Sequence, residues 1–308
     1  MKTIKQLNKK TRKPASPAKR GEQKSKKINK PKVAIVGLTC CEGCEFAILD
    51  LGEKFLELAK RIDLVHWRFI KDDPEKIGPY DICFVEGSAV TKDNVRLLKK
   101  LRKNSGQLIV LGNCAHFGGI HRMKNWVGRY KALGEVYEEP EGIDNLDILP
   151  ISEIVKVDFT IPTCPINGEE FLDIVLQILA GKKPQIRQNP VCLECQASGY
   201  ECLLQKGEIC CGPVILGGCN AVCLKSKQAC WGCRGLLEEP DVDKFVKNCF
   251  LTGHSAAAVK KVLEVFGVKD DWLNQAQKEW RGGKTETGLV KVKRAINRAS
   301  PRNLGGAS

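Results

Sequence analysis

The chain has 308 residues, 16 of them cysteines, and a formal net charge of +14 at pH 7. It contains no apolar run near the roughly 20 residues that a membrane span needs, which predicts a soluble protein of about two domains. Residues 1–32 carry thirteen Lys or Arg and one acid, so subtracting their +12 from +14 leaves about +2 for the rest. A nearly neutral folded body removes the main support for nucleic-acid binding.

Residues 1–31 are predicted to be a disordered basic tail, because they combine like charges with prolines and almost no large apolar side chains. A targeting peptide is an alternative, although the segment lacks the apolar core and the twin-arginine pair of secretion signals. Binding to nucleic acid or to an acidic partner is another alternative for this tail.

Residues 32–184 alternate between strand-like and helix-like segments. The expected strands are 33–36, 62–70, 81–86 and 107–111, with a further apolar stretch at 155–161, and the expected helices are 46–61, 93–103 and 170–180. Such alternation predicts an α/β domain with a parallel sheet covered on both faces. The order of the segments suggests a flavodoxin-like domain.

Cysteines follow several of these strands directly. Cys40, Cys41 and Cys44 come after the first strand, Cys114 after the strand at 107–111, and Cys164 after residues 155–161. Open α/β sheets place their sites at the carboxyl ends of the strands. Four sulfurs from separate turns can therefore meet at this edge and hold one iron-sulfur cluster.

Residues 185–238, the cysteine-rich segment, are predicted to form a second, small domain with few regular elements. Nine cysteines lie between positions 192 and 233, with few long apolar runs between them, so we expect bound metal to hold the segment together. Disulfides do not suit a reducing cytosol. The two CxxC pairs at its ends suit zinc, but the additional cysteines between them favour two four-iron clusters; zinc and redox disulfides stay as alternatives.

The remaining residues are predicted to be helical and then loose. Residues 239–280 show helical spacing of apolar side chains, notably at 241–249 and 255–266, and residues 281–308 are basic and rich in glycine. Cys83 and Cys249 are expected to be buried apolar side chains, since free cysteine is commonly buried.

Six separated motifs together resemble one known family. They are Cys41-Glu42-Gly43-Cys44-Glu45, Val85-Glu86-Gly87-Ser88, residues 112–120 around Cys114, Thr163-Cys164-Pro165, Cys210-Cys211-Gly212-Pro213 and Cys230-Trp231-Gly232-Cys233-Arg234-Gly235. In this order they resemble the small, electron-transfer subunit of nickel-iron hydrogenases. The resemblance covers residues 33–236. It is to the cytosolic branch, which includes sulfhydrogenase delta subunits and the small subunits of methyl-viologen-reducing and deazaflavin-reducing hydrogenases.

The resemblance implies three four-iron (4Fe-4S) clusters with twelve cysteine ligands. A proximal cluster would be bound by Cys41, Cys44, Cys114 and Cys164. A distal cluster would be bound by Cys192, Cys195, Cys202 and Cys210, and a medial cluster by Cys219, Cys223, Cys230 and Cys233.

Two pairs of adjacent cysteines leave alternatives open. The tandem Cys40-Cys41 also resembles the small cluster-binding subunit of respiratory complex I, in which case Cys40 would replace Cys44. Cys211 lies beside Cys210 and could replace it, although the family spacing selects Cys210.

The resemblance also implies a function and partners. The chain would carry electrons, in the cytoplasm, between the nickel-iron centre of a separate large subunit and an electron-acceptor subunit of flavin, ferredoxin-like or heterodisulfide-reductase-linked type. Glu45 would transfer protons to or from the nickel site; the structural alternative is an acid in the first turn of a helix. The competing function is a stand-alone iron-sulfur or zinc protein whose basic tails bind nucleic acid.

Overall fold

The computed structural model describes residues 30–72, 74–127 and 129–270. Residues 1–29 of the predicted basic tail and the predicted loose end, 281–308, lie outside these residues. Within the described ranges, none of the helices has both the length and the apolar character needed to span a membrane.

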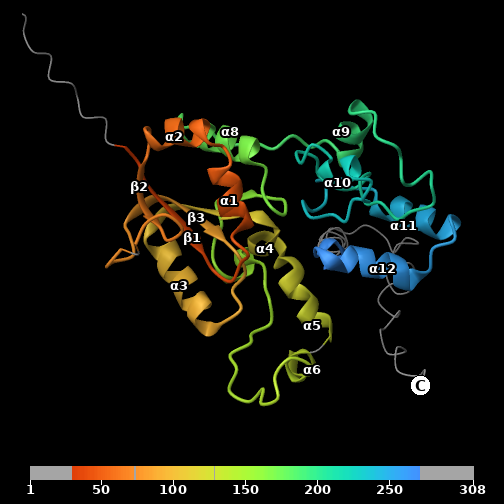
Figure 1. Ribbon diagram of the computed structural model, residues 1–308, viewed down its shortest axis with the longest axis horizontal. Helices are drawn as coiled ribbons and strands as arrows, with labels where there is room; N and C mark the ends of the chain where they lie inside the picture. Colours follow the sequence, from red (N-terminus) through yellow and green to blue (C-terminus); the bar gives the residue numbers. More distant parts are fainter. Residues whose placement is uncertain (1–29, 73, 128, 271–308) are drawn as a thin grey trace, which may run out of the picture.

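A five-stranded sheet, parallel throughout, forms the first half of the molecule (Figure 1). Its strands lie in the order β2-β1-β3-β4-β5. They are β1 (Lys32–Gly37), β2 (Asp63–Trp67), β3 (Tyr80–Glu86), β4 (Ser105–Leu111) and β5 (Phe159–Ile161). This is the flavodoxin-like order, so the predicted α/β fold class is confirmed.

Helices cover both faces of the sheet, and successive residues of β1 show why. Val33 and Ile35 pack on one face against α1 (Gly43–Leu49), α2 (Glu53–Ala59) and α8 (Gly168–Leu179). Ala34 and Val36 pack on the other face, with side chains of α3 (Lys92–Lys103), α4 (Gly112–Phe117) and α7 (Ile151–Ile154). Because neighbouring residues of a strand point to opposite faces, a strand buried on both sides is continuously apolar.

Some predicted boundaries were wrong. The helix expected over 46–61 is divided into α1 and α2, because Gly52 adopts a positive φ of 55° between them. The strand expected over 62–70 ends at Trp67, and only Phe159–Ile161 of the stretch 155–161 is a strand. The short helices η1 (Gly119–Arg122), α5 (Met123–Val127) and α6 (Arg129–Gly134) were not predicted.

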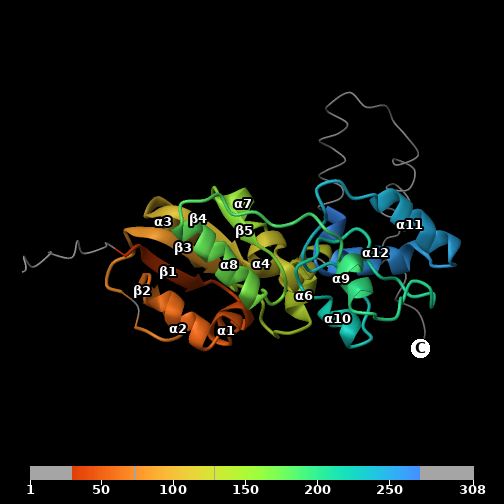
Figure 2. The ribbon, with the colours of Figure 1, turned by 90° about the horizontal axis from the view of Figure 1, so that it is seen from above.

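The second half of the molecule contains the cysteine-rich segment and two helices, which lie together in both views (Figures 1 and 2). Its elements are α9 (Val191–Ala197), α10 (Val222–Lys225), α11 (Val242–Leu251) and α12 (Ala256–Val265). The stabilising role of bound metal stays a prediction, but the segment also packs on an apolar core. Phe245 and Val246 of α11, with Val259 and Leu263 of α12, supply an apolar core against which the cysteine loops pack.

Candidate metal centres

Five cysteines gather at the carboxyl edge of the sheet. The loop after β1 supplies Cys40 and Cys41, α1 supplies Cys44, α4 supplies Cys114, and the loop after β5 supplies Cys164. Burial raises the pKa of Cys114, and nearby charge on Cys164 and Cys41, and to a smaller extent on Cys40, adds to the rise; burial likewise raises the pKa of Cys44, and charge on Cys164 adds to that rise. We call Cys41, Cys44, Cys114 and Cys164 the sheet-edge set.

Glycines provide the space that these thiols occupy. A Cβ atom added to Gly112 would lie 2.5 Å from Sγ of Cys44, and one added to Gly119 would lie 2.6 Å from Sγ of Cys114. Both glycines also have positive φ angles, of 77° and 58°. The backbone therefore approaches the sulfurs as closely as only glycine permits, which fits a site built around a bulky sulfur-bound group.

Burial keeps these thiols protonated when no metal or other positive group stabilises their thiolate form. Desolvation raises the pKa of Cys114 to about 12, with a further contribution from the neighbouring cysteines. It raises the pKa of Cys40 to about 12 and that of Cys44 well above its usual range. Because thiolates are the metal-binding form, these sulfurs need a strongly positive partner, and metal binding at this edge would release protons.

Two buried carboxyl groups lie beside the sheet-edge set. Glu86, the last residue of β3, accepts hydrogen bonds from the backbone amides of Cys44 at 3.2 Å and Glu45 at 3.1 Å. Glu45 accepts a hydrogen bond of 2.5 Å from Nε1 of Trp67. Burial raises the pKa of Glu45 to about 7, although the Trp67 hydrogen bond opposes the shift. A carboxyl group with this pKa can both donate and accept protons near neutral pH.

A second group of thiols shares one cavity. Cys219, Cys223, Cys230 and Cys233, the middle set, line a cavity of about 370 Å³ together with Cys164 of the sheet-edge set. The left-handed residues Asn220 and Ala221 turn the chain between the first two of these cysteines. The cavity therefore combines sulfur donors with enough room for a group larger than one metal ion.

The third group lies around α9. Cys192 and Cys195 of that helix are electrostatically coupled to Cys202 and Cys210, and these four form the outer set. A Cβ atom on Gly212 would lie 3.2 Å from Sγ of Cys192 and 3.6 Å from Sγ of Cys210. Burial is the main reason that the pKa of Cys192 rises to about 11. As at the sheet edge, a glycine leaves room beside the sulfurs.

The three sets are connected in series. The backbone amide of Cys164, in the sheet-edge set, donates a hydrogen bond to the sulfur of Cys233 in the middle set. The backbone amide of Cys230, in the middle set, donates a 3.3 Å hydrogen bond to Sγ of Cys210 in the outer set. The middle set thus touches both of the others.

The structure brings the cysteines of each predicted group near one another, and it places Cys83 and Cys249 outside the three sets, whereas Cys211 lies beside Cys210. Cys83 is fully buried in β3, and Cys249 is buried in α11. Cys211 is fully buried and is coupled to Cys210 and Cys249. Over residues 30–72, 74–127 and 129–270, no three His, Cys, Asp or Glu side chains are arranged to hold a single metal ion.

Sequence reasoning missed several residues that support these sets. Glu86 lies in a quoted motif, but nothing in the sequence indicated that it would bind the start of α1. Glu194, on α9, accepts hydrogen bonds from Gly218 and Ala221 and so connects the outer and middle sets. Such contacts arise from tertiary packing between distant segments, and no local spacing predicts them.

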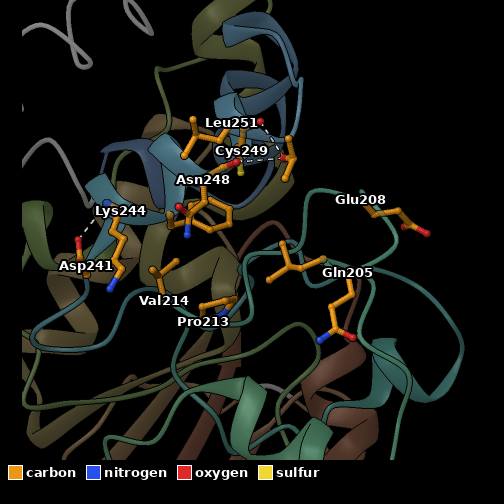
Figure 3. Close-up of a pocket in the computed structure, with 12 residues that line it drawn as sticks. Gln205, Glu208, Pro213, Val214, Asp241, Lys244, Asn248, Cys249 and Leu251 are labelled. Carbon is orange, nitrogen blue, oxygen red and sulfur yellow. Dashed lines mark hydrogen bonds between the residues drawn. The ribbon is translucent and has the colours of Figure 1, made fainter.

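An open pocket of about 540 Å³ lies beside the cysteine-rich segment (Figure 3). One side is lined by side chains of α11, including Asn248 and Leu251, and the other by Leu204, Gln205, Glu208, Pro213 and Val214. Its lining is mainly apolar, and its only cysteine is Cys249. It is therefore separate from the three thiol sets.

Comparisons with known proteins find one matching family model and several hydrogenase subunits. Residues 41–178 match the family described as NADH ubiquinone oxidoreductase, 20 Kd subunit. The chain is 35% identical over 223 residues to the sulfhydrogenase 2 subunit delta of Pyrococcus furiosus, covering 71% of this chain and 90% of that protein. It is 31% identical over 171 residues to the NAD-reducing hydrogenase HoxS subunit delta of Cupriavidus necator, covering 50% of this chain and 80% of that protein.

A solved structure supports the fold. The actinobacterial-type NiFe-hydrogenase from Ralstonia eutropha H16 matches with a TM-score of 0.50 and 17% identity, over 88% of this chain and 96% of the matched one. At this identity the likeness concerns the fold alone.

Proposed function

The chain belongs to the family of hydrogenase small subunits, non-catalytic components of an oxidoreductase complex, and on that premise we propose that it conducts electrons through three four-iron clusters. The path would run between the nickel-iron site of a large subunit and an electron-acceptor subunit. The observation that carries the proposal is the serial contact of the three thiol sets, Cys164 to Cys233 and Cys230 to Cys210.

Each set would hold one cluster. The sheet-edge set would bind the proximal cluster, the middle set the medial cluster and the outer set the distal cluster. In support, each set offers four sulfurs; glycines make room beside two of the sets, and a cavity lies beside the third. When bound, a four-iron cluster exchanges one electron at a potential set by its charge, its burial and the hydrogen bonds to its sulfurs.

The residues of the chain tune and protect these centres. The amides of Cys164 and Cys230 donate to sulfurs of neighbouring sets, which stabilises negative charge there. Trp231 lies between two thiols of the middle set and lines their cavity, where its indole limits access of water. The sheet supplies a rigid frame for the proximal site, since α1, α4 and the loop after β5 all start from its carboxyl edge.

Exposed groups at the sheet edge suit a large-subunit interface. Cys41 and Cys164 are exposed, and Phe46 of α1 and Ile120 of η1 are 52% and 51% exposed. Contiguous exposed apolar patches mark protein interfaces, and in this proposal Phe46 and Ile120 would belong to such a patch. Cys202 of the outer set is also exposed, which suits electron exchange with an acceptor subunit.

Glu45 would move protons at the proximal end. It is only 4% exposed, and its pKa of about 7 suits a group that alternates between acid and base. We also propose a cytoplasmic location, because the motifs resemble the cytosolic branch of the family. The alternative of a stand-alone zinc or iron-sulfur protein that binds nucleic acid is not favoured, since the relatives are hydrogenase subunits.

Metal analysis and spectroscopy test the proposal. The chain, purified with its large subunit without oxygen, should contain about twelve irons and show three one-electron centres. A single centre, or stoichiometric zinc without iron, would contradict it.

A further inference from the structure

Arg234 joins the two halves of the molecule through an ion pair whose arginine side chain is fully buried. Its side chain is 0% exposed, and its Nη1 and Nη2 atoms each donate a 2.8 Å hydrogen bond to the carboxylate of Glu170 on α8. Nη1 also donates to the hydroxyl of Thr163. A bidentate pair of this kind fixes both distance and orientation.

The neighbours of this pair are cluster ligands of the proposed function. Arg234 directly follows Cys233, and Thr163 directly precedes Cys164. Gly218, which precedes Cys219, has a φ of 116°, and a Cβ atom there would lie 2.7 Å from Oε1 of Glu170. The chain therefore leaves space for the ion pair between two thiols of the middle set and one of the sheet-edge set.

One nitrogen atom of the guanidinium has no hydrogen-bond partner among the described residues. This atom, Nε of Arg234, is buried. Arg234 also lines the 370 Å³ cavity together with the four thiols of the middle set. A buried N–H of a charged group without an acceptor is costly, so its retention points to an acceptor that occupies the cavity.

We infer that Arg234 is a positioning residue of the medial cluster: its Nε–H donates to a sulfur of that centre, and its pair with Glu170 holds that centre beside the proximal one. The inference rests on the proposed function. A cationic donor favours the more negative, reduced form, so Arg234 should raise the reduction potential of the medial centre. The carboxylate of Glu170 partly offsets this charge.

Substitutions of the pair separate this role from a purely structural clamp. Potentials would be measured by redox titration followed by electron paramagnetic resonance on the complete complex, and Cys233→Ser would identify the medial signal. In Arg234→Gln, the ratio of reduced to oxidised medial centre at a fixed potential should fall about tenfold, equivalent to about 59 mV for one electron. Glu170→Gln should move the same ratio upward, because the positive charge then loses its counter-ion.

A matched control uses another arginine–carboxylate pair. Arg102 donates a hydrogen bond to Asp158 near the amino end of β4, and neither residue lines the 370 Å³ cavity. Arg102→Gln should leave all three potentials unchanged. Arg234→Lys, which keeps the charge but loses Nε, should restore part of the Arg234→Gln shift.

The outcomes are distinguishable. An unshifted medial potential in Arg234→Gln with full iron content would overturn the inference and leave the proposed function intact. Should Arg234→Gln lose iron, Glu170→Gln decides, and an unchanged medial potential there would also overturn it. A wild-type complex without three centres would instead refute the proposed function.

Discussion

Cys164 and Cys233 are 69 positions apart in the sequence, yet the backbone amide of the first donates a hydrogen bond to the sulfur of the second. One residue belongs to the loop after β5 and the other to the cysteine-rich segment. The contact means that the sheet-edge set and the middle set lie directly against each other. Any electron path through the chain therefore depends on how firmly the two halves are joined.

The adjacent cysteines Cys40 and Cys41 provide the first prediction. Cys44 lies beside Gly112, and burial raises its pKa, with charge on Cys164 adding to the rise. Cys40 lies beside Gly37 and Gly87 instead, and after burial it contributes less than Cys164 and Cys41 to the raised pKa of Cys114. We expect Cys44→Ser to lose or convert the proximal centre and Cys40→Ser to retain about twelve irons. Iron analysis and the proximal resonance signal measure this. The reverse pattern would favour the arrangement that resembles complex I.

Gly112 provides the second prediction. Alanine there is expected to displace Sγ of Cys44, because a Cβ atom would lie 2.5 Å from that sulfur and the φ of 77° disfavours a side chain. The Gly112→Ala chain should therefore lose about four irons while keeping its sheet. Gly142 also has a positive φ, but a Cβ atom there meets nothing within 4 Å, so Gly142→Ala is the matched control. Equal iron content in both variants would show that the close approach has no role in holding the centre.

Much of the fold could be predicted from the sequence, and the site only in outline. Apolar stretches such as 33–36 and 107–111 indicate buried parallel strands, and their alternation with helices predicts a parallel sheet. The short helix α4 has no such pattern, because it begins at Gly112 and ends before Gly118, and both glycines have positive φ angles. The grouping of twelve cysteines into three ligand sets stays a prediction, although the structure brings each group together.

The charged residues around the sites were harder to foresee. Arg234 and Glu170 are 64 positions apart, and Glu86 binds amides at positions 44 and 45. Each is an ordinary surface-type residue in its local sequence. Only the folded backbone shows that these charges are buried and paired.

Cys210 and Cys211 provide the third prediction. Cys211 is fully buried and its backbone amide pairs with the carbonyl of Cys230, while Sγ of Cys210 accepts the amide of Cys230. Cys210→Ala should lose the distal centre. Cys211→Ala should keep it and lower the free energy of unfolding by about 1 kcal/mol, the cost of a small cavity. Iron content and denaturant unfolding distinguish the two, and loss of iron from Cys211→Ala alone would reverse the assignment.

Glu45 provides the fourth prediction, which concerns pH. Its pKa is raised to about 7, so below that pH the carboxyl is protonated and cannot accept a proton, and above it the carboxylate cannot donate one. Hydrogen–deuterium exchange by the complex should therefore be fastest near pH 7 and fall on both sides. Glu45→Gln should slow exchange by about 10²-fold or more and abolish this bell shape. If Glu45→Gln keeps its clusters and exchanges hydrogen and deuterium at an unchanged rate, Glu45 has no role in proton transfer and serves only as the hydrogen-bond acceptor of Trp67.

Removal of iron provides the last prediction. The sheet has its own apolar core on both faces, whereas the second half buries Cys195, Cys210 and Cys230 within its core. Chelation under reducing conditions should therefore open the cysteine-rich segment first, because its empty thiols must be protonated and its loops lose their cross-links. Backbone amide exchange followed by mass spectrometry should show loss of protection over 190–236 and retention in β1, β3 and β4. Uniform loss of protection would mean instead that the two halves unfold as one cooperative unit.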